Sequence, residues 1–275
     1  MKPIPASTSL MDEGKNEFVK YSIVIPAYNE AARIAPTLEK ILAHTAQQGW
    51  QAEILVVNDG SRDNTAEIVR ECAQRNPSVK LVENPGNRGK GYSVRNGMLH
   101  AQGDILLFSD ADLSAPIYEA SKLFTALESG AGVAIGSRWM NRALQIEKQP
   151  LLRQFFGRIF NLALRIVLNL KQKDTQCGFK AFTRRAADTI FPRQRIERWG
   201  FDPELLFLAH RLGFKVAEVP VEWAHDDRST IHPLRDGIKM FFEMLKVRWN
   251  SITGKYKVPH LALGPPDSNP SERTA

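Results

Sequence analysis

The chain is predicted to fold as an α/β protein with a mainly parallel central sheet and helices on both faces. Along its first half, short apolar runs typical of buried strands alternate with segments whose apolar residues have helical spacing. Strands and helices that alternate in this way form parallel sheets covered on both sides. A length of 275 residues, with 43% hydrophobic and 24% charged residues, suits one large soluble domain with a substantial core.

The elements are expected in the order that this alternation gives. Strands are predicted at 21–25, 54–57, 79–82, 104–108, 133–135 and 216–221, because apolar residues dominate each of these short runs. Helices are predicted at 30–44, 64–73, 91–101, 117–127, 151–170 and 203–212. The second helix would begin with Asn64-Thr65-Ala66-Glu67, which has the pattern of a capping box with Asn64 as the N-cap.

Polar residues gather where the predicted strands end. In parallel α/β sheets, ligands bind beyond the carboxyl ends of the strands. The residues that follow the first strands are 27–30, Asp59, 87–90 and 110–114. We therefore expect them to form one site.

Asp110 and Asp112 are the most informative residues of this site. They follow a buried strand and lie two residues apart, so their side chains point the same way. Two close carboxylates repel each other and raise each other's pKa, which a divalent cation would relieve. Mg²⁺ takes one or two carboxylates and completes its shell with water and substrate phosphates. The pair predicts a metal that holds a diphosphate; the alternative is an ordinary turn, because Ser114 and Pro116 follow.

Several motifs together resemble a known family. The segments 23–30 (IVIPAYNE), 57–61 (VNDGS) and 110–112 (DAD) are similar to those of inverting family-two glycosyltransferases with the Rossmann-like GT-A fold. The segments 87–91 (NRGKG), 136–138 (GSR), 174–180 (DTQCGFK) and 198–206 (RWGFDPELL) resemble polyprenyl-phosphate glycosyltransferases. Dolichyl-phosphate β-glucosyltransferases match best and dolichyl-phosphate mannosyltransferases next.

The resemblance implies roles for the residues at matching positions. The nucleotide-sugar donor would be bound by Pro26, Ala27, Tyr28, Glu30, Asp59, Lys90, Asp110 and Ala111. Asp110 and Asp112 would hold Mg²⁺ or Mn²⁺, with Asp112 the more direct ligand. Arg138 and Lys180 would grip the acceptor phosphate, to which the planar fork of an arginine is suited. The alternatives are an ordinary turn at Asp59 and solvated or structural charges at Lys90, Arg138 and Lys180.

Two carboxylates are candidates for the catalytic residue. Asp174 is slightly preferred, because its spacing after the aspartate pair fits the family pattern. Asp202 is the second candidate, although Asp202-Pro203-Glu204 also fits a helix start with the aspartate as N-cap. A phosphate monoester has its second pKa near 6, so it is largely dianionic at neutral pH and hardly needs a general base. Either aspartate could instead orient the acceptor or stabilise positive charge on the sugar.

Two amphipathic segments predict contact with a membrane surface. Residues 151–170 carry a polar stripe of Gln154, Arg158, Asn161, Arg165 and Asn169 beside an apolar face. Three arginines argue against a span and favour a helix lying in the interface. Residues 236–257 form the second candidate, with aromatic residues beside lysines and arginines. The alternative is that both helices pack on the core or in a homo-oligomer interface.

The remaining features bound the organisation and location of the chain. Residues 1–20 are expected to be an extension that is neither a signal peptide nor a membrane anchor, 21–235 the glycosyltransferase domain, and 258–275 a disordered tail. The net charge of +7 suggests anionic partners. The two cysteines have no metal-like spacing, which suits a reducing cytoplasm. We expect a cytoplasmic protein, peripheral at the inner face of the membrane.

The expected activity is inverting transfer of a hexose to polyprenyl phosphate, with UDP-glucose as the first choice of donor and GDP-mannose as the second. One rival keeps the fold but uses a soluble sugar or glycerate derivative as acceptor. Another is a non-catalytic module that binds nucleotide sugars, which the Asp110/Asp112 pair argues against. Nucleic acid is not an expected partner, because the basic residues are scattered and no recognition motif is present.

Overall fold

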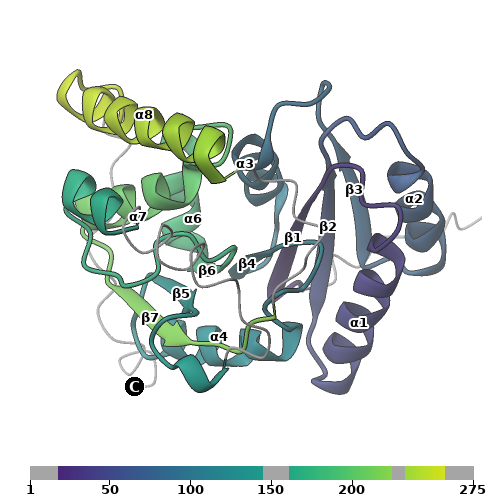
Figure 1. Cartoon of the computed structure of the whole chain (residues 1–275). Coiled ribbons are helices and arrows are strands. Elements are labelled where there is room, and N and C mark those ends of the chain that lie inside the picture. Colours follow the sequence, from purple (N-terminus) through teal and green to yellow (C-terminus); the bar gives the residue numbers. More distant parts are fainter. Residues whose placement is uncertain (1–17, 145–160, 225–232, 258–275) are drawn as a thin grey trace, which may run out of the picture.

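A computed structural model describes residues 18–144, 161–224 and 233–257, and these residues form a seven-stranded sheet with helices on both faces (Figure 1). The strands are β1 (Tyr21–Ala27), β2 (Ala52–Asn58), β3 (Val79–Glu83), β4 (Ile105–Ser109), β5 (Val133–Ser137), β6 (Phe179–Thr183) and β7 (Val216–Pro220). The predicted α/β class is confirmed. Most of the predicted N-terminal extension, the first half of the predicted 151–170 helix and the predicted tail lie outside the described residues.

The helices lie close to their predicted positions, except Arg184–Ile190, which the sequence did not predict as a helix. They are α1 (Ile34–Gln47), α2 (Thr65–Arg75), α3 (Lys90–His100), α4 (Ala120–Glu128), α6 (Arg184–Ile190), α7 (Phe201–Arg211) and α8 (Pro233–Ile252), and 161–168 is also helical. Short 3-10 turns occupy η1 (Ile117–Glu119), η2 (Arg142–Leu144) and η3 (Phe191–Arg193). In the parts of the chain that the structure describes, no helix combines the length and apolar character needed to cross a bilayer.

The predicted capping box of α2 is wrong. Asn64 occupies the N-cap, but its side chain makes no capping hydrogen bond. The carboxylate of Asp63 replaces it and accepts a hydrogen bond from the Thr65 N–H at 3.1 Å. The same carboxylate accepts the Ala31 N–H, so it also fixes the loop that follows β1.

The strand order is β3-β2-β1-β4-β6-β5-β7, and one strand departs from the expected parallel arrangement. β6, which the sequence did not predict, runs antiparallel to both β4 and β5. Its register pairs Phe179 with Ser109, so β6 begins where β4 ends. The amino end of β6 therefore lies at the same edge of the sheet as the carboxyl ends of the parallel strands.

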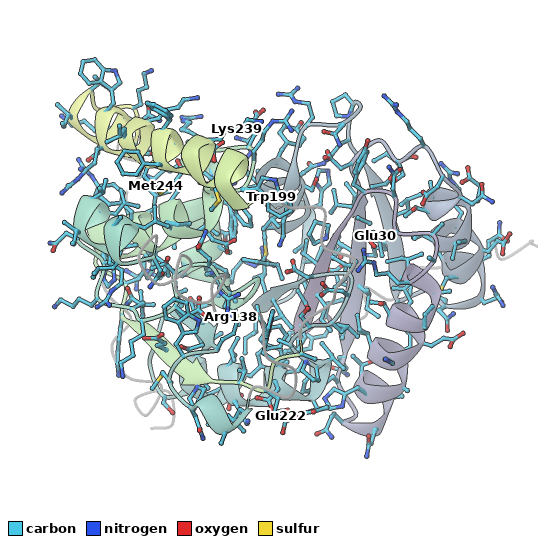
Figure 2. The ribbon with its side chains drawn as sticks, viewed as in Figure 1. Glu30, Arg138, Trp199, Glu222, Lys239 and Met244 are labelled. Atoms are coloured by element: carbon cyan, nitrogen blue, oxygen red, sulfur yellow. The ribbon has the colours of Figure 1, made fainter. Side chains whose placement is uncertain are left out.

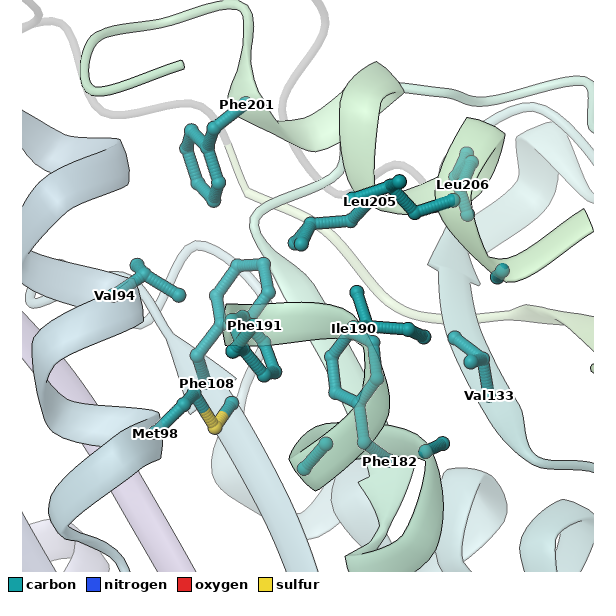
Figure 3. Close-up of a cluster of buried hydrophobic side chains, with 14 of the residues drawn as sticks. Val94, Met98, Phe108, Val133, Phe182, Ile190, Phe191, Phe201, Leu205 and Leu206 are labelled. Atoms are coloured by element: carbon teal, nitrogen blue, oxygen red, sulfur yellow. The ribbon is translucent and has the colours of Figure 1, made fainter. Parts of the chain in front are cut away.

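Alternating side chains of the strands form two apolar layers. Ile23 and Ile25 of β1 pack with α1 on one face, whereas Val24 packs with α3 on the other. Figure 3 shows the second layer, in which aromatic residues join β4, β6 and α7. The ring centroids of Phe108 and Phe201 lie 5.7 Å apart, which fixes the start of α7 over the end of β4. This packing brings the second half of the chain to the predicted site.

Candidate active site

The predicted site residues converge at one edge of the sheet. β1, β2, β4 and β5 all end there, and β6 begins there. These five strand ends carry, in order, Glu30, Asp59, Asp110, Arg138 and the Asp174–Lys180 segment. The structure thus brings together residues that are spread over most of the sequence, as expected for a doubly covered α/β sheet.

The aspartate pair lies against a lysine and a glycine. Lys90, the first residue of α3, forms an ion pair with Asp110. A Cβ atom at Gly178 would lie 2.8 Å from the Asp110 carboxyl carbon, so only glycine leaves room for this carboxylate. Burial and then the charge of Asp110 raise the pKa of Asp112. Burial alone would lower the pKa of Lys90, but the carboxylates of Asp110 and Asp202 outweigh it and raise that pKa.

Glu30 adds a third carboxylate to this side of the site. It pairs with Arg33, yet burial raises its pKa, and the charges of Asp112 and Asp110 contribute in the same direction. Of the other predicted donor-binding residues, Tyr28 is exposed and Pro26 is half-buried, while the side chains of Ala27 and Ala111 are buried in the core. The two alanines can therefore reach a donor only through their backbones.

Asp59 has a structural task that the sequence did not predict. Its two carboxylate oxygens accept hydrogen bonds from Asn84 Nδ2 at 2.8 Å, the Arg88 N–H at 2.9 Å and the Gly89 N–H at 2.8 Å. These bonds shape the loop that leads to Lys90. Direct contact of Asp59 with the donor stays a prediction, and its observed role is to position that loop.

Asp174 is committed to Arg138. Arg138 Nε and Nη2 donate to the two Asp174 oxygens at 2.7 and 2.8 Å, and the Arg138 N–H adds a third bond at 3.0 Å. Burial by itself would raise the pKa of Asp174, but the guanidinium outweighs it and holds that pKa below its usual range. The side chain is 1% exposed. In this geometry Asp174 orients Arg138, and its role as the catalytic carboxylate stays a prediction.

Lys180 and Asp202 form a buried ion pair. Lys180 is 0% exposed and also donates to the Cys177 carbonyl oxygen at 2.5 Å. Burial and two partners hold the Lys180 ammonium away from solvent, and direct contact of Lys180 with the acceptor phosphate stays a prediction. Asp202 is not an N-cap, since α7 begins at Phe201 with Gly200 as its N-cap.

Trp199 is a site residue that the sequence analysis missed. Its ring centroid lies 5.5 Å from Lys90 Nζ, and its side chain is exposed. It precedes the start of α7 by two residues, so the start of this helix lies beside Lys90. The sequence did contain a signal for Trp199, because this aromatic residue lies next to Gly200 in the family-like segment 198–206, three positions before Asp202.

The residues present fit a divalent cation that takes part of its ligands from the protein and part from a substrate. No group of three or more His, Cys, Asp and Glu side chains able to hold a metal occurs within the described ranges. Asp110 and Asp112 provide two carboxylates at the site, and burial followed by the charge of Asp110 raises the pKa of Asp112. That donor set suits Mg²⁺ or Mn²⁺, whose remaining ligands are water and phosphate oxygens.

Comparison with known proteins gives consistent relatives. Residues 22–191 match the family model "Glycosyl transferase family 2". A dolichyl-phosphate beta-glucosyltransferase of Trichomonas vaginalis is 40% identical over 82% of this chain and 70% of its own length. Enzymes of the same name from Saccharomyces cerevisiae (34% identity, 92% of this chain, 81% of the relative) and Homo sapiens (30%, 86% and 77%) are also similar.

Solved structures agree with the GT-A fold. Mannosyl-3-phosphoglycerate synthase from Rubrobacter xylanophilus superposes with a TM-score of 0.61 at 16% identity, over 90% of this chain and 79% of the other. Glucosyl-3-phosphoglycerate synthase from Mycobacterium tuberculosis, in complex with Mn²⁺, UDP-glucose and phosphoglyceric acid, superposes with a TM-score of 0.59 at 18% identity, over 88% and 81%. With its family match, its relatives and its fold in agreement, the chain belongs to glycosyl transferase family 2 and is a glycosyltransferase.

Proposed function

We propose that this enzyme transfers glucose from UDP-glucose to a polyprenyl phosphate such as dolichyl phosphate, with inversion at the anomeric carbon. The observation that carries the proposal is the similarity, over most of both chains, to several dolichyl-phosphate beta-glucosyltransferases. The geometry supports it. Asp110 and Asp112 with Lys90 suit a diphosphate and its cation. Arg138, which Asp174 holds in place, suits the acceptor phosphate.

On the donor side, Lys90 is placed to exchange partners. Its ammonium pairs with Asp110 and can shift to the diphosphate oxygens when UDP-glucose enters. Asp110 and Asp112 would hold Mg²⁺ or Mn²⁺, which as a Lewis acid supports the charge that develops on the departing UDP. The Asp59-braced loop keeps the start of α3 in place while this charge moves.

On the acceptor side, Arg138 is placed to orient the acceptor phosphate. Asp174 holds the guanidinium in one orientation by a bidentate contact, and the side chain keeps about a fifth of its surface accessible (20%). A phosphate oxygen attacks the anomeric carbon, the bond from that carbon to the UDP oxygen breaks, and its electron pair leaves with UDP. The attacking dianion carries no proton to remove, so no side chain has to act as base.

We also propose that α8 holds the enzyme on an anionic membrane surface, on the cytoplasmic side. Met240, Met244, Val247 and Asn250 pack α8 against the protein. Apolar residues recur at steps of three and four on the opposite side of this helix: Phe242, Leu245, Trp249 and Ile252. Trp249 is 62% and Ile252 79% exposed. Helical spacing places Lys239 and Lys246 along one border of this apolar face and Arg248 along the other, which suits lipid headgroups.

The predicted interfacial helix at 151–170 differs from its prediction in the side chains that it exposes. In the described part, 161–168, Asn161 of the polar stripe is buried and accepts a hydrogen bond from Thr175 Oγ1 at 2.7 Å. Leu162 and Ile166 are exposed instead. Arg248 Nε donates to the Val167 carbonyl oxygen at 2.6 Å, so this helix abuts α8 and its exposed apolar residues can join the same surface.

The test of the activity is transfer of labelled sugar into organic-extractable lipid. Purified protein is incubated with polyprenyl phosphate in detergent and with UDP-glucose or GDP-mannose, in Mg²⁺ or in EDTA. We expect metal-dependent label in the lipid from UDP-glucose alone. Label from GDP-mannose alone would replace the donor, and label in a soluble phosphoglycerate acceptor alone would replace the acceptor.

The membrane proposal has a separate test in vesicle sedimentation. Phe242→Ser together with Trp249→Ser should weaken binding to anionic vesicles at least about tenfold, since two aromatic side chains leave the interface. Leu99→Ser, which changes an exposed apolar residue on α3, is the matched control and should bind like the parent. A double variant that binds vesicles normally but sediments as a smaller particle would assign the apolar face to a homo-oligomer interface.

A further inference from the structure

The segment 194–200 has a backbone held from two sides. On the α3 side, Gln194 Nε2 donates to the Gly91 carbonyl oxygen at 2.8 Å, and the Tyr92 N–H donates to the Glu197 carbonyl oxygen at 2.9 Å. A Cβ atom at Gly91 would lie 2.7 Å from the Ile196 carbonyl oxygen, so the two backbones touch. The segment therefore moves with the first turn of α3, which carries Lys90.

The other side of the same segment rests on α8. The Gly200 N–H donates to Glu243 Oε2 at 2.8 Å, and a Cβ atom at Gly200 would collide with Glu243 and Met244. Further along, Glu204 of α7 accepts hydrogen bonds from the Arg195 and Ile196 N–H groups at 3.0 and 2.9 Å. The segment is thus a fixed bridge between the donor loop and the helix that carries the exposed apolar face.

Trp199 is the large apolar side chain that this bridge presents. Its residue is 38% exposed although its backbone is fixed, and its ring lies beside the Lys90 ammonium. Figure 2 shows Trp199 near the end of α8 that carries Lys239, on the side facing α3. An indole so placed lies between the Lys90 ammonium and the end of α8 that faces α3.

That position matches the chemistry of the proposed acceptor. In a polyprenyl phosphate the reacting phosphate is joined directly to an apolar chain that stays in the membrane. The phosphate must reach the neighbourhood of Lys90 and Asp110, so the first isoprene units have to pass between this neighbourhood and α8. An aromatic face buries apolar area in water, which stabilises such a chain where it leaves the lipid.

We propose that Trp199 is a specificity-determining residue whose indole contacts the phosphate-proximal isoprene units of the acceptor. The proposal rests on the proposed function, because it takes a polyprenyl phosphate as the acceptor. The segment 194–200 holds the indole in place, and Trp199 discriminates acceptors by their first isoprene units rather than by their total length.

The test compares acceptors of two lengths in detergent. Transfer from UDP-glucose is measured with a two-isoprene phosphate and with a long polyprenyl phosphate, for the parent, Trp199→Ala and Trp199→Phe. Trp199→Ala should raise the acceptor KM at least tenfold, and by the same factor for both lengths. Trp199→Phe should stay within threefold, and the KM for UDP-glucose should stay within twofold in both variants.

Leu99→Ala, which shortens an exposed apolar side chain on α3, is the matched control and should leave both KM values unchanged. Thermal unfolding separates loss of fold from loss of contact, and Trp199→Gln, which replaces the ring with a polar side chain, carries the same tenfold expectation if Trp199→Ala unfolds. A rise in the UDP-glucose KM instead would place the indole against the donor and overturn the proposal, as would unchanged acceptor KM values in a parent enzyme that transfers normally. A parent enzyme with no transfer to either lipid would overturn the proposed function first and this inference with it.

Discussion

The carboxylates on the donor side of the active site differ from those on the acceptor side in their pKa shifts and their ion pairs. On the donor side, Glu30 pairs with Arg33 and Asp110 with Lys90, while Asp112 lies close to both Asp110 and Lys90; the pKa of Asp112 and that of Glu30 are raised. On the acceptor side, each buried aspartate has a cation of its own: Asp174 pairs with Arg138, and Asp202 pairs with Lys180.

This difference distinguishes carboxylates that we expect to take part in the reaction from carboxylates that hold the structure in place. A buried carboxylate that is paired and hydrogen-bonded in the folded protein holds its neighbours in place. On the donor side, burial and the neighbouring Asp110 raise the pKa of Asp112, and such perturbed groups concentrate at functional sites. We infer that the donor side is completed by a cation that arrives with substrate, whereas the acceptor side is complete in the protein itself.

Removing one donor-side carboxylate should have the largest effect on activity. Asp112→Asn should lower transfer at least about 1,000-fold, or about 4 kcal/mol of transition-state stabilisation, because the departing diphosphate loses its charge partner. Transfer of labelled glucose at saturating Mg²⁺ measures this loss. Asp188→Asn, the same change at an exposed aspartate of α6, is the control and should retain full activity. Near-normal activity of Asp112→Asn would remove the metal site from the donor side.

Breaking an acceptor-side pair should cost stability. Lys180→Met leaves Asp202 buried beside an apolar side chain, so the free energy of unfolding should fall by about 3 to 5 kcal/mol. Adding Asp202→Leu should restore much of that loss, since an apolar pair replaces an ionic one. Chemical denaturation gives both values. Arg70→Met, which breaks exposed ion pairs, should cost less than about 1 kcal/mol; a similarly small cost at Lys180 would contradict the scaffold role.

Glu204 shows a third way to accommodate a buried acid. It accepts hydrogen bonds from Tyr256 and two backbone N–H groups, and burial raises its pKa to about 7. The folded state therefore keeps a proton that the unfolded state loses above about pH 4.5. Its contribution to stability is present below that pH and should fall by up to about 3 kcal/mol as the pH rises to about 7.

Denaturation of the parent and of Glu204→Gln across this pH range tests that sign. The variant should start less stable, because an amide cannot reproduce every hydrogen bond, but its stability should vary less between about pH 5 and about pH 7. Glu39→Gln, at an exposed position of α1, should follow the parent curve. Parallel curves for the parent and Glu204→Gln would mean that Glu204 is ionised throughout.

The donor side was largely predictable from the sequence, for a local reason. Asp110, Asp112 and Asp59 directly follow apolar runs, and the ends of parallel strands meet at one edge. Lys90 begins a helix that follows one such strand. Each residue is therefore located by its own neighbours in sequence and by the general rule for α/β sheets.

The acceptor side was less predictable, because its residues are defined by distant partners. Arg138 and Asp174 are 36 residues apart, and Lys180 meets Asp202 only because β6 runs antiparallel beside β4. A five-residue strand with a lysine in its middle region resembles a loop in sequence, so its direction and the burial of Lys180 were not apparent. Trp199 was missed for the same reason, since its position follows from the bridge between α3 and α8.

The smallest expected effect tests whether Asp174 positions Arg138 or acts on the reacting atoms. Asp174→Asn keeps the size of the side chain but removes its charge and one of its two acceptor oxygens, so the guanidinium should be held less firmly. We expect the acceptor KM to rise about tenfold, about 1.4 kcal/mol, with kcat and the pH profile unchanged. Steady-state transfer over a range of pH measures all three. If Asp174→Asn instead abolished one limb of the pH profile and lowered kcat at a normal acceptor KM, Asp174 would act on the reacting atoms, and the acceptor side would not be a scaffold.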